Sequence, residues 1–220
     1  MIEINKLVRS KRKTLSLIVE ADGTLTVRAP LRMKEADILR FIETKKDWIK
    51  RKQAQARKDA FFSRQYVDGE IFRYLGREVL LRIVPDGKPA LVMDGSFKLT
   101  KSAQLQAKSV FTTWYKKQAR KVLIERADFF ARKYGFKMGK VRISSARTRW
   151  GSCSSKDTLS FTWRLVMASP DVLDYVVVHE LCHLRELNHS SSFWAQVESI
   201  LPEYKSQLKW LKQNGAKLRL

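Results

Sequence analysis

The residues with the clearest chemistry lie in a single window, from 179 to 189, which holds all three histidines of the chain. It reads His179-Glu180-Leu181-Cys182-His183, and five residues separate His183 from His189. Histidines four apart on a helix share one face, so two imidazoles can bind one metal ion. We therefore predict a zinc site made by His179, His183 and His189, with one coordination position left for water.

Glu180 stands directly beside the first of these histidines. Hydrolytic zinc needs a vacancy for a water molecule, whose pKa falls to about 7 when bound, and a carboxylate to take the proton of that water. We predict Glu180 as this general base, which later acts as general acid toward the leaving group. The alternative is a chance coincidence of three unrelated histidines, and their confinement to one window argues against it.

The chain has only two cysteines, Cys153 and Cys182, and Cys182 lies between two of the predicted zinc ligands. This arrangement argues against a disulfide framework and favours a reducing compartment. On a helix, Cys182 points about 100° away from His183, so we expect it to pack rather than bind metal. Cys153 has no spare histidine to activate it as a nucleophile.

The flanking sequence indicates the elements that position the window. Ser169-Pro170-Asp171 is a typical helix start, and an apolar run leads from Tyr175 into His179, so we predict a buried helix. Strand patterns precede this helix at residues 141–144, 148–153 and 158–163. An antiparallel hairpin there would give an edge strand able to hold an extended peptide.

The remaining sequence predicts an α+β protein. A β-meander is expected over residues 2–29, with a hairpin at Asp22-Gly23. An amphipathic helix should follow at residues 34–58 and several antiparallel strands at residues 66–100. A long helix is expected at residues 102–134, packed on the catalytic helix. We divide the chain into a strand-rich basic region with one amphipathic helix, residues 1–100, and a catalytic domain, residues 101–220.

The charge is strongly basic, with 44 Lys and Arg against 22 Asp and Glu, a formal net charge of +22. Anionic partners such as nucleic acid or nucleotides therefore stay open, although no nucleic-acid-binding motif accompanies the charge. No apolar run approaches the 18 or so residues of a membrane helix, and the N-terminus is charged. We expect no membrane partner and a cytoplasmic location, while the sequence leaves the oligomeric state undetermined.

Further site residues are predicted with alternatives. Arg149, Trp150 and Gly151 form a candidate substrate-binding segment, in which the glycine either admits another backbone or makes a bulge. Tyr204, Tyr175 or Arg149 could donate a hydrogen bond to the developing oxyanion, although Tyr204 could instead be ordinary packing. Carboxylates that could support the zinc histidines are Glu186, Glu198 and Asp174.

Several segments together resemble the YgjP-like metallopeptidase family, whose wider relatives are the SprT-like and WLM zinc peptidases. They are Arg149-Trp150-Gly151-Ser152-Cys153-Ser154, Leu159-Ser160-Phe161, Trp163-Arg164-Leu165, Tyr175 to Leu184, Asn188-His189-Ser190, Phe193-Trp194 and Leu201-Pro202-Glu203-Tyr204. The resemblance spans most of the chain. It implies a minimal zincin-like core, the three histidines as zinc ligands, Glu180 as catalytic acid/base, and a peptide or protein substrate.

Two other functions stay open, because zinc with a general base can hydrolyse other bonds. One is a metal-dependent nucleoside triphosphate pyrophosphatase, in which Arg147 and Arg149 would clamp phosphates. Against it, the sequence has no Gly-rich phosphate loop and no acidic cluster for Mg²⁺. The other is a nucleic-acid-associated peptidase of the SprT-like kind, whose basic surface would give salt-dependent binding.

Overall fold

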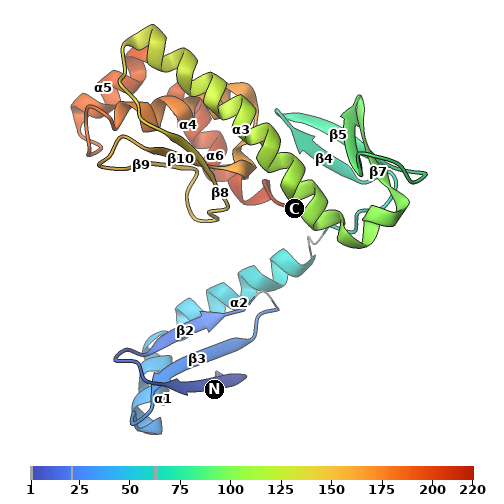
Figure 1. Ribbon diagram of the computed structural model, residues 1–220. Coiled ribbons are helices and arrows are strands. Elements are labelled where there is room, and N and C mark those ends of the chain that lie inside the picture. The colour runs from blue at the N-terminus through green and yellow to red at the C-terminus, as the bar shows by residue number, and fades with distance from the viewer. Residues whose placement is uncertain (1, 21, 62–63) are drawn as a thin grey trace. The chain divides into compact units, whose positions relative to one another are not determined.

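The computed structural model describes residues 2–20, 22–61 and 64–220 (Figure 1). The chain forms two compact units, Met1–Arg64 and Gln65–Leu220. Both combine helices with small sheets, so the predicted α+β class is confirmed. Among the described residues, no helix is both long and apolar enough to cross a membrane.

The first unit is a three-stranded sheet with two helices. Its elements are β1 (Lys6–Ser10), β2 (Ser16–Val19), β3 (Leu25–Pro30), α1 (Glu35–Thr44) and α2 (Lys46–Phe61). The hairpin at Asp22-Gly23 is confirmed: β2 and β3 are antiparallel, Gly23 has φ 89°, and Asp22 accepts a hydrogen bond of 2.9 Å from the Thr24 N–H. The buried core includes Leu25, Val27, Ile38 and Ile49.

Two predictions for this unit are wrong in detail. The strand order is β1-β3-β2 and β1 runs parallel to β3, so the segment is not a meander. The predicted helix over 34–58 is divided at Lys45, where ψ is 10°, into α1 and α2. Helical spacing continues across the break, so the apolar pattern alone did not reveal it.

The second unit begins with a four-stranded sheet of order β4-β5-β7-β6. Its strands are β4 (Ile71–Tyr74), β5 (Arg77–Val84), β6 (Leu91–Asp94) and β7 (Ser96–Thr100). The strands were predicted as antiparallel, but β5 and β7 are parallel. Neighbouring strands in sequence do form antiparallel pairs, β4 with β5 and β6 with β7. Hairpin signals reach only such neighbours, so they missed the parallel pair.

This sheet packs against the part of the chain that carries the histidines. The Leu75 N–H donates to the Val166 carbonyl at 2.7 Å, and the Tyr115 hydroxyl donates to the Arg73 carbonyl at 2.6 Å. At Gly76, whose φ is 77°, an added Cβ would lie 2.9 Å from the Cα of Ser169. The chain divides into its two compact units between residues 64 and 65. The domain boundary predicted at residues 100 and 101 stays a prediction.

A second small sheet, of order β8-β10-β9, precedes the helix that carries His179. Its strands are β8 (Val141–Ser144), β9 (Gly151–Cys153) and β10 (Leu159–Thr162). The antiparallel β9–β10 pair is confirmed, with β9 at one edge. The core is not wholly antiparallel as predicted, because β8 and β10 are parallel. Residues 148–150, predicted as strand, belong to a loop that Arg164 holds through the Ser145 and Ala146 carbonyls, both at 3.2 Å.

Helices complete the second unit. They are η1 (Lys101–Gln106), α3 (Ala107–Tyr134), η2 (Trp163–Met167), α4 (Pro170–Cys182), α5 (Ser191–Ile200), α6 (Tyr204–Asn214) and η3 (Gly215–Lys217). In Figure 1, α3 runs from the four-stranded sheet to the group of α4, α5 and α6. The predicted packing of α3 on the metal helix α4 is confirmed by the ion pair of Arg126 and Asp174, with an N–O distance of 2.6 Å.

Candidate metal centre

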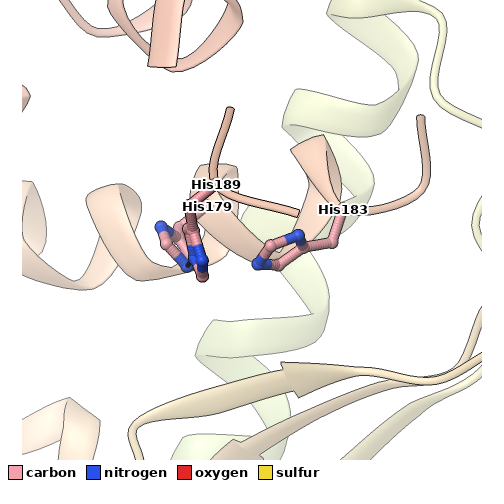
Figure 2. A group of neighbouring side chains, drawn as sticks. All are labelled: His179, His183 and His189. Atoms are coloured by element: carbon pink, nitrogen blue, oxygen red, sulfur yellow. Dashed lines mark hydrogen bonds between the residues drawn. The ribbon is translucent and has the colours of Figure 1, made fainter. Parts of the chain in front are cut away.

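The three histidines converge from two parts of the chain (Figure 2). His179 lies in the last turn of α4, His183 caps the end of that helix, and His189 lies just before α5. Their ring centroids are 4.8–4.9 Å apart in every pair. One nitrogen from each ring lies within 4.8 Å of the others, and the Nε2 atoms of His179 and His189 are 3.0 Å apart.

A main-chain carbonyl orients His183. Its Nδ1 lies 3.0 Å from the Glu186 oxygen. A carbonyl can only accept, so Nδ1 donates this hydrogen bond, and Nε2 is the ring nitrogen that remains to bind a metal. This is the arrangement that fixes a metal-binding imidazole.

Aromatic side chains from α5 hold the three rings. Phe193 is completely buried and contacts all of the histidines, with ring-centroid distances of 4.5–4.9 Å. Trp194 stacks on His189 at 5.6 Å and 26°. The Ser190 hydroxyl accepts from the Phe193 N–H at 3.2 Å, which caps the start of α5. Phe193 could not be recognised from the sequence as a contact of every histidine, because that contact arises only in the tertiary structure.

Burial and the two neighbouring imidazoles lower the pKa of His179 to about 3. This ring is therefore neutral at physiological pH, as a metal ligand must be. Its Nδ1 is buried without a hydrogen-bond partner among the described residues. The orientation of His179 therefore depends on packing against Phe193 and Tyr175, whose centroid lies 5.9 Å away.

Glu180 is buried, with 5% of its surface exposed, and lies against strand β9. Burial raises its pKa to about 7, against the opposing effects of Arg149 and a hydrogen bond from the Cys153 backbone. An added Cβ at Gly151 would lie only 2.5 Å from Oε1 of Glu180. The missing side chain at Gly151 therefore provides the space that the carboxyl group occupies.

The donor set suits a metal ion. Nitrogen–zinc bonds of about 2.1 Å in a tetrahedral site put ligand nitrogens roughly 3.4 Å apart. The 3.0 Å separation of the His179 and His189 nitrogens is near that value, and small rotations of the rings would bring in His183. Both cysteines are free and neither joins the cluster; Cys182 is fully buried, in agreement with its predicted packing role.

The other predicted site residues take different places. Gly151 contacts Glu180, while Trp150 packs on Gly215 at the end of α6, where an added Cβ would lie 2.6 Å from the indole. Arg149 is exposed, and its charge acts on Glu180. Tyr204 is buried between Trp194 and Tyr175, at centroid distances of 5.3 and 6.3 Å.

None of the three carboxylates predicted to support the histidines does so in the described structure. Asp174 pairs with Arg126, and Glu198 pairs with Lys205 at 3.0 Å. Glu186 contributes through its main-chain carbonyl, which accepts from His183. The sequence could not reveal this contact, because any residue at position 186 has a carbonyl.

Three converging imidazoles beside a buried carboxyl group, in an α+β unit, make a candidate metal site of the kind used by metallohydrolases. The family model of the YgjP-like metallopeptidase domain matches residues 13–214. The chain therefore belongs to the YgjP-like metallopeptidase family, as its motifs indicated, and that family implies a metal ion at the site.

One solved structure is similar to part of the chain. The crystal structure of the metallopeptidase zymogen of Pyrococcus abyssi abylysin is 25% identical over 43% of this chain and 93% of that chain, with a TM-score of 0.36. No curated protein matches significantly.

Proposed function

We propose that this protein is a zinc-dependent metallopeptidase. The observation that carries the proposal is the convergence of His179, His183 and His189 next to Glu180, in a chain of a metallopeptidase family. Imidazole nitrogens are ligands that zinc favours, and three of them leave one position open. When bound, zinc would supply a Lewis acid that lowers the pKa of water and polarises the substrate carbonyl.

Glu180 is proposed as the general base and acid. It follows His179 on α4 and accepts a hydrogen bond from the Cys153 backbone. Its carboxyl group occupies the space left by the missing side chain at Gly151. Its carboxylate would take a proton from the attacking water and then give it to the leaving amine. Since the carboxyl group is buried and confined, little reorganisation is needed when the substrate arrives.

Strand β9 is proposed to bind the main chain of the substrate. It lies at the edge of its sheet, and only β10 pairs with it in the described structure. An edge strand can add an extended peptide through main-chain hydrogen bonds. Because Gly151 and Cys153 of β9 also position Glu180, a peptide added there would lie close to the base.

The donor for the developing oxyanion is proposed to be Tyr175 or Arg149. Tyr175 lines a pocket together with His179 and Glu180. Burial raises its pKa to about 12, so its hydroxyl keeps the proton that a donor needs. Tyr204 stacks on Tyr175 and does not line that pocket, which favours a packing role.

The decisive experiment tests purified, zinc-loaded protein in parallel on an unfolded protein, a peptide library and nucleoside triphosphates. Glu180→Gln is the catalytic variant, and Glu198→Gln, which breaks the exposed ion pair with Lys205, is the matched control. We expect peptide-bond cleavage that disappears only in Glu180→Gln. Glu180-dependent release of pyrophosphate without peptide cleavage would contradict a peptidase and support the pyrophosphatase alternative.

A further inference from the structure

A pocket of about 280 Å³ opens directly beside the catalytic carboxyl group. His179 and Glu180 form part of its wall. One residue of an extended chain spans about 3.3–3.6 Å. A side chain in this pocket would therefore belong to a residue next to the bond undergoing reaction, or very near it.

The pocket is mostly apolar. Trp150 and Tyr175 provide aromatic walls, and α6 contributes Leu208 and Leu211. Leu211 is buried, while Trp150 and Leu208 are half-buried, so apolar surface faces the opening. Its volume exceeds the ~150 Å³ of a cavity that holds a benzene ring, and is small for a drug-sized ligand. It suits one large aromatic or aliphatic side chain.

A lysine side chain lines the pocket without an acidic partner in the described structure. Lys212 of α6 lines it, is exposed, and forms no ion pair in the described structure. Arg149, next to Trp150, is also exposed, and its positive charge acts on Glu180. Lys205, at the first turn of α6, differs, because it forms an ion pair with Glu198 at 3.0 Å. The opening thus offers positive charge beside an apolar interior.

We infer that this pocket sets the specificity of the enzyme: it takes a large apolar side chain next to the scissile bond, and Lys212 pairs with a carboxylate of the same substrate. The inference rests on the proposed peptidase function. The carboxylate can come from an adjacent acidic side chain or from the C-terminus of a short peptide. Both sources offer Lys212 the same charged group.

The first test measures kcat/KM for blocked peptides that differ at one position. Peptides with Phe or Leu next to the cleaved bond should exceed those with Ala by about 10- to 100-fold, the effect of burying such a side chain. Leu208→Trp fills the half-buried opening and should abolish this preference. Leu211→Ala enlarges the pocket and should shift the preference toward Trp.

The second test addresses the charge. A neighbouring Asp should raise kcat/KM about two- to fivefold over Asn, the effect of an exposed ion pair, and Lys212→Glu should reverse that order. Lys209→Glu makes the same change on α6 outside the pocket and should leave the order unchanged. Comparing free with amidated C-termini identifies the second source of the carboxylate.

Binding provides a readout that does not need turnover. Fluorescence anisotropy of labelled peptides bound to the Glu180→Gln variant should rank the peptides in the same order as kcat/KM does. Adding Leu208→Trp should remove the preference for Phe or Leu over Ala, and adding Lys212→Glu should reverse the preference for Asp over Asn. Glu180-dependent cleavage without any of these preferences would overturn the pocket inference and leave the peptidase function intact. Absence of both cleavage and peptide binding would overturn the two together.

Discussion

The metal site combines two regions of different character, the helix α4 and the turn that follows it. His179 and Glu180 lie inside the helix, among residues that are almost all buried. His189 is exposed, and the turn leading to it includes Leu187, which is 82% exposed. The helix places its residues through backbone hydrogen bonds, whereas His189 depends on contacts made by its neighbours.

The turn has its own anchors. Arg185 donates to the carbonyls of Tyr134 and Gly135 at 2.8 and 3.0 Å, and its guanidinium lies 4.1 Å from the Phe136 ring centroid. These contacts fasten the turn to the end of α3. Ser190 and Trp194 fix its other end at α5. A change at Glu180 in the helix should therefore affect chemistry, whereas changes in the turn should affect metal affinity.

The largest effect is expected for Glu180→Gln. Loss of the general base should reduce kcat about 10³-fold, because general-base catalysis contributes roughly 10²–10⁴. Metal content, measured by mass spectrometry, should stay equal to that of the unchanged protein, because the three imidazoles remain. Substantial turnover in this variant would exclude Glu180 as the base.

Next, His189→Ala should weaken zinc binding about 10²–10³-fold, as removal of one ligand in a tight site does. Competition with a chromophoric chelator measures this affinity.

His183→Ala should weaken zinc binding similarly and also lower the stability of the metal-free protein by about 1–2 kcal/mol, because it removes the hydrogen bond to the Glu186 carbonyl and the packing on Phe193. Equal metal-free stability of the two variants would remove the contrast between helix and turn.

Gly151→Ala should lower kcat about 100-fold with little change in zinc affinity. The new Cβ would meet the Glu180 carboxyl group, and a misplacement of about 1 Å can cost that much. Gly87→Ala is the matched control for stability and activity, because a Cβ added at Gly87 would have no atom of the described structure within 4 Å, apart from those of Gly87 and its two chain neighbours. A fully active Gly151→Ala protein would argue against a confined position for Glu180.

The smallest effect is expected for Arg185→Ala, about a tenfold loss of zinc affinity with kcat unchanged at saturating metal. The variant removes the anchor between the turn and α3 without touching a histidine, and supporting contacts typically contribute 10- to 100-fold in affinity. Arg132→Ala, on the exposed side of α3, is the control. A loss of kcat at saturating zinc would show that the turn also positions the substrate.

Local patterns predicted much of the second unit. The helix start at Ser169-Pro170 and the antiparallel β9–β10 pair both follow from signals that act within a few residues. Pairings between distant segments were missed. Each of the parallel pairs β1–β3, β5–β7 and β8–β10 joins two strands that have another strand between them in the sequence. Hydrophobic alternation does not indicate the partner or the direction of such a strand.

The sequence by itself determined the chemical identity of the site, because histidines four apart on a helix share a face whatever surrounds them. Only the tertiary structure decided what supports them. Gly151 leaves room for Glu180, the Glu186 carbonyl orients His183, and Phe193 packs on all three rings. These contacts join residues from separate elements or use atoms common to every residue. The folded chain alone brings them together.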